Sequence, residues 1–353
     1  MSAMSPSARR PALPGSILAV LAAIALALAA CSSSGAGASP SASVAAVASA
    51  TPILTPAPTP SPTPAPAFPV TLTDDEGGTV TFAAEPQKIV SLTPAVTETL
   101  FAVGAGDRVV ATDDSSDYPA EAKDLQDVVT FGTVDVEKII SLSPDLVIAG
   151  GAGFTSADAI ARLRDVKIPV LVVSTPSIDG IYKDIELVGT AVGASDEATA
   201  ITTEMRADIQ AIADAAQAES QEATTKPRVF YDVGYIDPTG QVYGPGEGSF
   251  LAEMVGLLGV DVITGDKLTY EIPLEKLIER DPQTIILGVN AFYTPTPETI
   301  AKRPGWKVLS AVKSGHVRSV TDTEITRPGP RLATGMHNLA LAMYPDLQLP
   351  PVN

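Results

Sequence analysis

Two arginines near the carboxyl end of the chain could bind an anionic or planar group. Arg327 and Arg331 flank residues 328–330 (PGP), just before a predicted helix, in a chain whose net charge is −18. A guanidinium matches carboxylates and stacks on π systems, whereas positive charge at a helix N-terminus is mildly unfavourable. The pair therefore predicts contact with a ligand carboxylate, amide or chelate ring. The alternative is surface charge or an ion pair with Asp322 or Glu324.

Aromatic, glycine and small polar residues follow several predicted strands. Ligands of open α/β sheets bind outside the carboxyl ends of the strands, and aromatic residues on loops beside a cleft are often functional. As a set facing one cleft they suit a large, flat, partly apolar ligand. Taken singly, each is explained equally well by local packing, and the residues around 93–97 by an ordinary helix N-cap. The predicted ligand residues are Pro94, Thr97, Tyr118, Phe131, Gly151, Tyr243, Ser249, Tyr270, Phe292, Arg327 and Arg331.

The residues typical of enzymes and metal proteins are sparse. His316 and His337 are the only histidines, and a zinc site needs a cluster of ligands. No GxSxG, HExxH or phosphate-loop motif occurs, and residues 244–248 (GPGEG) lack the lysine and hydroxyl of a phosphate loop. We expect no catalytic residue, no metal held by protein atoms and no cofactor.

The N-terminus has the pattern of an export signal. Arg9 and Arg10 precede an apolar stretch at residues 16–30, which is shorter than the ~20 residues of a membrane span. Small residues then lead to Cys31, the only cysteine, in a pattern that resembles a bacterial lipobox. We therefore expect a signal peptide at 1–30, lipidation of Cys31 and anchoring to the outer face of the cell membrane or in the periplasm. The alternative is a plain signal peptide or a membrane anchor.

Composition changes along the chain and separates a tether from a folded part. Residues 31–67 are rich in Ser, Ala, Pro and Thr without a hydrophobic period, so they predict an extended tether. Strands then alternate with helices, which predicts parallel sheets covered on both faces. We expect an N-terminal α/β lobe at 68–176, bridging helices at 177–224 and a C-terminal α/β lobe at 225–353. A helix from Ser195 to about Ser220 has no Gly or Pro.

Four motifs in order give the chain a family resemblance. They are KIVSLTPAVTE at 88–98 followed by SDYP at 116–119, VEKIISLSPDLV at 136–147, and RPGPRL at 327–332. Together, ahead of one bridging helix, they make the chain similar to the periplasmic binding proteins for ferric siderophores and cobalamin, over residues 68–346. The resemblance implies two α/β lobes joined by a long rigid helix, a ligand cleft between them and only small closure. The whole binding domain is then about 88–350.

The resemblance also implies a docking role for two acids. One surface glutamate per lobe pairs with permease arginines in the similar proteins, and Glu137 and Glu253 match those positions. Two charges at a fixed separation set register and on-rate. The alternative is that a glutamate in the first helical turn only suits the helix dipole.

These observations predict a monomeric solute-binding lipoprotein of an ABC importer, whose partners are a membrane permease and ATPase. Its acidity disfavours nucleic acid. The expected ligand is a small-molecule metal chelate, with a corrinoid such as cobalamin as first choice. A ferric siderophore or haem is the alternative, the latter with Tyr118 or Tyr243 as axial ligand. A remote alternative is an envelope or sensor protein that uses the same fold.

Overall fold

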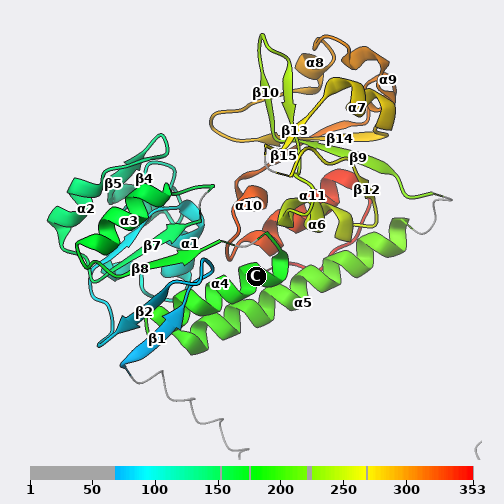
Figure 1. Ribbon diagram of the computed structural model, residues 1–353. Coiled ribbons are helices and arrows are strands. Elements are labelled where there is room, and N and C mark those ends of the chain that lie inside the picture. Colours follow the sequence, from blue (N-terminus) through cyan, green and yellow to red (C-terminus); the bar gives the residue numbers. More distant parts are fainter. Residues whose placement is uncertain (1–67, 152, 175, 221–224, 268, 353) are drawn as a thin grey trace, which may run out of the picture. The chain divides into compact units, whose positions relative to one another are not determined.

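The computed structural model describes residues 68–151, 153–174, 176–220, 225–267 and 269–352 (Figure 1). The predicted signal peptide at 1–30, the lipidation site Cys31 and the tether at 31–67 lie outside the described residues. Among the residues that are described, no helix is long and apolar enough to cross a membrane.

The N-terminal lobe contains a six-stranded sheet with the order β6-β5-β4-β3-β7-β8, preceded by an antiparallel hairpin. All neighbouring strands of this sheet are parallel except β5 and β6. The strands of the lobe are β1 (Val70–Thr73), β2 (Thr79–Phe82), β3 (Ile89–Ser91), β4 (Val109–Asp113), β5 (Gln126–Thr130), β6 (Thr133–Val134), β7 (Leu146–Gly150) and β8 (Val170–Val173). The helices are α1 (Pro94–Ala102), α2 (Val136–Leu142) and α3 (Ala157–Asp165), with 3-10 turns at Gly106–Arg108 and Ala120–Asp124.

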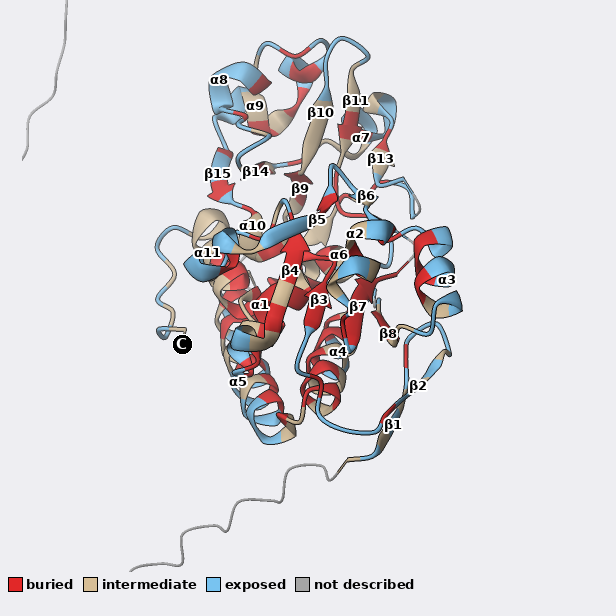
Figure 2. Ribbon diagram, turned by 90° about the vertical axis from the view of Figure 1, so that its left-hand side faces the viewer, coloured by how far each residue is buried: buried red, intermediate tan, exposed pale blue. Residues whose placement is uncertain are grey.

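Helices cover both faces of this sheet, which is why its central strands are apolar at successive positions (Figure 2). Alternate residues of a strand point to opposite faces. On β7, Leu146 and Ile148 join one hydrophobic cluster with α1, while Val147 and Ala149 join another with α2 and α3. The sheet is thus the middle of three layers.

The C-terminal lobe repeats this arrangement around a parallel four-stranded sheet with the order β12-β9-β14-β15. A three-stranded antiparallel sheet, β10-β11-β13, adjoins it. The strands are β9 (Arg228–Asp232), β10 (Gly234–Ile236), β11 (Gln241–Tyr243), β12 (Asp261–Val262), β13 (Glu271–Ile272), β14 (Thr284–Val289) and β15 (Val317–Thr321). The helices are α6 (Phe250–Leu257), α7 (Leu274–Arg280), α8 (Pro297–Ile300), α9 (Ser310–Ser314), α10 (Thr323–Thr326) and α11 (Leu332–Met343), with a 3-10 turn at Trp306–Val308.

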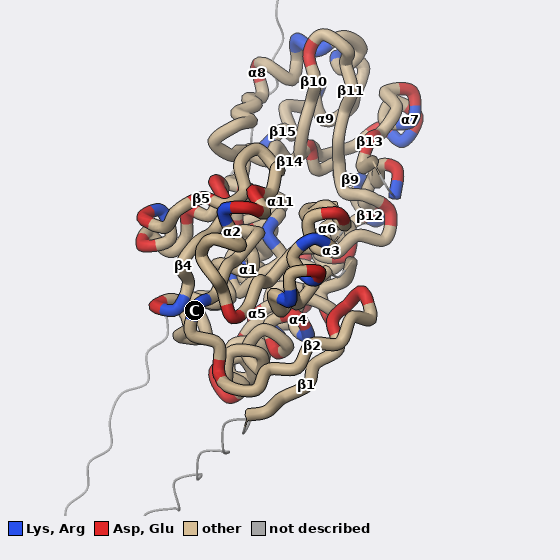
Figure 3. The backbone as a smooth tube through the Cα atoms, turned by 60° about the vertical axis from the view of Figure 1, so that its left-hand side comes forward, with Lys and Arg blue, Asp and Glu red and all other residues tan. Residues whose placement is uncertain are grey.

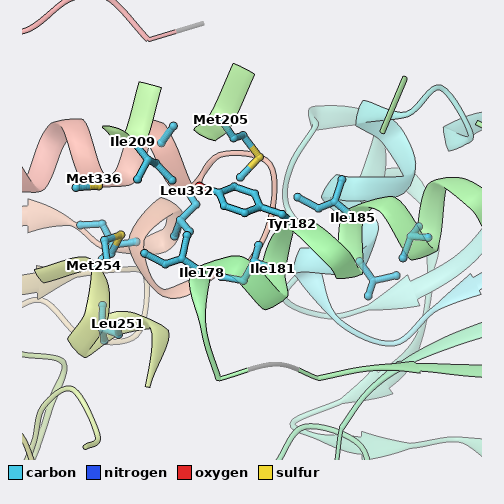
Figure 4. Close-up of a cluster of buried hydrophobic side chains, with 14 of the residues drawn as sticks. Ile178, Ile181, Tyr182, Ile185, Met205, Ile209, Leu251, Met254, Leu332 and Met336 are labelled. Carbon is cyan, nitrogen blue, oxygen red and sulfur yellow. The ribbon is translucent and has the colours of Figure 1, made fainter. Parts of the chain in front are cut away.

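Two consecutive helices connect the lobes. They are α4 (Ile178–Ala191) and α5 (Ser195–Ser220), and Gly193, with a φ of 76°, allows the turn between them. The 26 residues of α5 span about 39 Å, and this helix contacts α4, α6 and α11. Apolar side chains from these four helices belong to one cluster, which includes Ile178, Met205 and Met254 (Figure 4). A single hydrophobic core therefore runs from one lobe into the other.

The predicted fold class is confirmed, namely two α/β lobes joined by a long helix. The helix predicted at the RPGPRL motif begins at Leu332. The prolines at 328 and 330 lack the N–H groups that a helix needs, and the short helix α10 precedes them.

Candidate functional site

A cavity of about 410 Å³ lies between loops of the two lobes. From the N-terminal lobe it is lined by the segments that follow β3, β7 and β8 and by one face of α4. From the C-terminal lobe it is lined by the segment before α6, by the loop between β12 and β13, and by the segment that follows α10. Parallel strands bring their carboxyl ends to one edge of a sheet, which is where ligands of α/β folds bind.

Two partly exposed aromatic rings line the cavity, one from each lobe. Phe154 is 66% exposed and Tyr270 is 46% exposed. Gly150 lets Phe154 approach β7, since a Cβ at Gly150 would lie 2.9 Å from the Cβ of Phe154. Gly246 does the same for Tyr270, whose ring occupies the space that a side chain at Gly246 would need. Such rings favour a ligand with a planar or apolar surface.

Backbone hydrogen bonds hold the Tyr270 loop in place. Tyr270 N–H donates to the carbonyl of Asp266 at 2.9 Å, and its carbonyl accepts from Gly244 N–H at 3.0 Å. Tyr270 itself has a φ of 59°, which is uncommon for a residue with a side chain. The fold thus fixes an unusual backbone conformation that presents this ring to the cavity.

Polar groups occupy separate parts of the cavity wall. Asp184 lies on α4 in the N-terminal wall, whereas Glu247 and Lys267 lie on exposed loops of the C-terminal wall. Burial, together with the nearby carboxylate of Asp75, raises the pKa of Asp184 to about 8. Ser249 caps α6 by accepting a hydrogen bond from Ala252 N–H.

A cluster of ion pairs borders the cavity and joins the lobes. Arg327 donates to Glu98 at 2.9 Å, to Asp117 at 2.6 Å and to the carbonyl of Ser115 at 3.0 Å. Arg331 donates to Glu98 as well. The Glu98 side chain is only 2% exposed. We call this set of residues (Glu98, Asp117, Arg327 and Arg331) the interlobe clasp.

Arg331 has further partners on the side of the clasp away from Phe154 and Tyr270. It binds Glu324 at 2.9 Å, and its guanidinium lies 4.0 Å from the centre of the Tyr118 ring. The ion pair with Glu324 is one of the alternatives that the sequence offered. Glu98, the shared partner of both arginines, was not anticipated, although an acid inside the apolar segment AVTETLFA was a usable signal.

The structure brings some of the predicted ligand residues to the interlobe cavity. Those that line it are Pro94, Ser249, Tyr270 and Arg327. Tyr118 and Arg331 line a second cavity of about 550 Å³ between α1, α5 and the start of α11. Phe292 is 86% exposed and lines a third cavity of about 370 Å³ with Tyr235, Tyr293 and Arg303.

The remaining predicted ligand residues lie elsewhere. Thr97 is fully buried, and its hydroxyl bonds those of Ser91 and Thr112 at 2.8 and 2.7 Å, because the helix turns this face toward the sheet. Gly151 is buried against Ser174, and Gly150 and Gly153 of the same segment line the cavity. Tyr243 is half-buried in β11 beside Gly234, and Phe131 is 91% exposed after β5 without lining any of these three cavities.

The two predicted docking acids are exposed and lie on different lobes. Glu137, in the first turn of α2, pairs with Arg162 at 2.7 Å. Glu253, in the first turn of α6, accepts a hydrogen bond from Ile178 N–H at 2.9 Å, at the beginning of α4. Each acid therefore already has a partner within the chain.

Sequence reasoning did not single out several residues of the cavity. Phe154 lies three residues after Gly151, but only Gly151 was predicted from this segment as a ligand residue. Asp184, Glu247 and Lys267 were also missed. Asp184 carried no local signal, because only the packing of α4 against the β1–β2 hairpin gives it a special environment.

A cavity between strand-end loops of two α/β lobes is typical of a ligand-binding protein. The profile of the Periplasmic binding protein family matches residues 89–323, and the chain belongs to this family. It is 36% identical over 284 residues to an uncharacterized ABC transporter substrate-binding lipoprotein of Bacillus subtilis, covering 79% of this chain and 87% of that one. It is 28% identical over 288 residues to a cobalamin-binding protein of Halobacterium salinarum, covering 79% and 75%.

Solved structures show the same fold. The periplasmic vitamin B12 binding protein of Vibrio cholerae is similar with a TM-score of 0.61 and 25% identity, over 73% of this chain and 96% of that one. A periplasmic heme-binding protein of a Roseiflexus species, in its apo form, has a TM-score of 0.64 and 25% identity, over 74% and 99%.

Proposed function

We propose that this protein is the solute-binding component of an ABC importer and that it captures a metal chelate, with a corrinoid as the first-choice ligand. The observation that carries the proposal is the interlobe cavity with Phe154 and Tyr270 in its opposite walls. Its remaining lining is largely apolar and includes Val96, Ile185 and Val188. A macrocycle with apolar faces and polar side groups suits such a surface. The relatives named as a substrate-binding lipoprotein and as cobalamin-binding proteins support the assignment.

The proposed action is binding, slight closure, docking and release, without bond cleavage. The ligand brings its metal already chelated. Closure is small because the hydrophobic core and the interlobe clasp both cross the boundary between the lobes. Opening the lobes widely would break the hydrogen bonds of the clasp and expose the apolar side chains that the lobes share.

Haem or a ferric siderophore is the second candidate ligand. The observation that favours haem is the phenol of Tyr270 at the cavity, because tyrosine is a known axial ligand of haem iron. Tyr118 and Tyr243, the tyrosines expected for this role, do not line the interlobe cavity.

The partners follow from the same proposal. Lipidated Cys31 anchors the protein to the outer face of the cell membrane or in the periplasm, and the tether gives the binding domain reach. A monomer docks on the permease and ATPase complex through Glu137 and Glu253, which are exposed on separate lobes. Because both acids have partners within the chain, permease arginines would have to replace Arg162 and compete with the N-terminus of α4.

The experiment is equilibrium dialysis of the full-length protein in detergent against cyanocobalamin, haem and a set of ferric siderophores, with bound ligand measured by visible absorbance. Saturable binding of cyanocobalamin with a dissociation constant of about 1 μM or below supports the corrinoid assignment. Binding of haem or a siderophore alone keeps the importer role and changes the ligand. Failure of every chelate to bind contradicts the proposal.

A further inference from the structure

The N-terminal wall of the interlobe cavity carries one carboxyl group that has a second carboxyl group beside it. Asp184 lines the cavity from α4. Asp75 lies in the acidic turn between β1 and β2, which Figure 3 shows in red near α4. Asp75 is fixed there because its N–H donates to the carbonyl of Val172 at 3.2 Å and its carboxylate accepts from Ser174 N–H at 2.6 Å. Ser174 itself lines the cavity, so Asp75 is bound to the same wall that carries Asp184.

The pKa of Asp184 lies above neutral pH, which favours its protonated form there. Burial is the main cause that raises its pKa to about 8, and the charge and hydrogen bond of Asp75 add to it. Across the cavity the charged groups are Glu247, Lys267 and Arg327, of which Arg327 is held by the interlobe clasp. On the neighbouring helices, the guanidinium of Arg206 on α5 lies over the ring of Tyr182 on α4, and the charge of Glu253 on α6 also acts on Tyr182.

A protonated carboxyl group offers an O–H donor and a C=O acceptor side by side. A primary carboxamide has the complementary pair, an acceptor oxygen and an N–H donor. A ligand carboxylate lacks the donor and would meet the negative charge of Asp75, so it is disfavoured. Corrinoids carry carboxamide side chains around the ring, whereas haem carries carboxylates.

We propose that Asp184, supported by Asp75, is a specificity-determining residue that pairs with a peripheral carboxamide of the ligand and rejects ligands with a carboxylate in that place. The inference rests on the proposed function and deepens it, since it names the feature of the ligand that the N-terminal wall recognises.

The test uses two probes that share a corrin ring and cobalt. Dicyanocobinamide has side chains that end in amides, and dicyanocobyrinic acid has side chains that end in carboxylates. The affinity of the full-length protein for each is measured by equilibrium dialysis from about pH 6 to about pH 9, which brackets the Asp184 pKa of about 8. The variants are Asp184→Asn and Asp75→Asn, and the control is Glu279→Gln, an exposed carboxylate on α7 that does not line the interlobe cavity.

We expect the wild type to prefer dicyanocobinamide by at least about tenfold at pH 6 and to lose affinity for it as the pH rises through about 8. Asp184→Asn keeps a donor and an acceptor at every pH, so its affinity for dicyanocobinamide stays constant over this range. Asp75→Asn removes the neighbouring charge, so the loss of affinity moves to lower pH. Glu279→Gln follows the wild type, because this residue does not line the cavity.

Some results would overturn the inference while leaving the proposed function intact. These are equal affinity of the wild type for both probes, or a pH profile that Asp184→Asn and Asp75→Asn leave unchanged. If the amide probe, the acid probe and cyanocobalamin all fail to bind to the folded wild type, the corrinoid assignment fails and the inference fails with it. Circular dichroism shows that each variant is folded before its affinity is compared.

Discussion

Arg331 donates two parallel hydrogen bonds to Glu98, and these bonds join the two lobes. Its Nε donates to Oε2 at 2.9 Å and its Nη2 donates to Oε1 at 2.6 Å. Glu98 lies on α1 of the N-terminal lobe, and Arg331 immediately precedes α11 of the C-terminal lobe. This paired geometry is the strongest form of a guanidinium–carboxylate contact. The two arginines that looked like ligand contacts therefore also hold the protein together.

Removal of the Glu98 carboxylate should destabilise the protein strongly. Glu98→Ala leaves Arg327 and Arg331 without their shared partner, and breaking a buried ion pair costs about 3–5 kcal/mol. Urea denaturation measures the loss. The matched control is Glu137→Ala, whose ion pair with Arg162 is exposed and should be worth about 1 kcal/mol or less. Equal effects of the two substitutions would show that the clasp does not hold the lobes together.

Substitution of Arg331 should mainly lower stability, whereas substitution of Phe154 should mainly lower ligand affinity. Arg331→Ala is expected to cost about 2 kcal/mol of stability and to change chelate affinity little, because Arg331 does not line the interlobe cavity. Phe154→Ala should leave stability within about 0.5 kcal/mol, since the ring is 66% exposed. It should weaken chelate binding about tenfold. Thermal melts and dialysis on both variants check this, and the reverse pattern would place the ligand at Arg331.

Asp184 should make stability depend on pH. Its pKa rises from the ordinary 3.8 to about 8 in the folded protein, so between these values the unfolded chain loses a proton that the folded protein keeps. Stability therefore falls as pH rises across this window, by at most about 1.4 kcal/mol per pH unit, and the contribution is constant above it. Asp184→Asn should flatten this part of the profile. The measurement is the melting temperature of the wild type and of Asp184→Asn from acid to mildly alkaline pH. Parallel curves for the two proteins would contradict the role of Asp184 in this pH dependence.

The docking acids should affect uptake without affecting ligand affinity. Glu137→Ala and Glu253→Gln are expected to lower uptake of the chelate by cells while dialysis gives unchanged affinities, because neither residue lines the interlobe cavity. Glu253→Gln retains an acceptor for Ile178 N–H, which keeps the beginning of α4 capped. As a control, Glu279→Gln changes another exposed acid of the C-terminal lobe. Normal uptake by both docking variants would contradict the docking role of Glu137 and Glu253.

The fold could be predicted from the periodicity of the sequence, because the buried faces of strands and helices dictate where apolar residues occur. The apolar runs at β3 and β7 need cover on both faces, and the Gly- and Pro-free segment from Ser195 needs a long helix. The strands β5, β6, β10, β11 and β13 were not recognised individually. Two of them have only two residues each, too few to display an alternating pattern.

The candidate site was predicted only in part, since long-range packing decides which side chains reach the cavity. Tyr270 could be found because it is an aromatic on a loop, and Arg327 because of its motif. Thr97 has the same local setting as Pro94, yet the direction of α1 turns Thr97 to the sheet and leaves Pro94 at the cavity. The partnership of Asp184 with Asp75 joins segments that are far apart in the sequence, and no local pattern reports it.

The most direct test of the proposed function compares cyanocobalamin binding by the wild type with that of the double variant Phe154→Ala/Tyr270→Ala. Equilibrium dialysis gives both affinities, and Val308→Ser, at a position that is 50% exposed away from the cavity, is the control. If the interlobe cavity binds the corrinoid, the wild type and the control bind it equally and the double variant loses about a hundredfold in affinity. Unchanged affinity in the folded double variant would contradict the interlobe cavity as the ligand site.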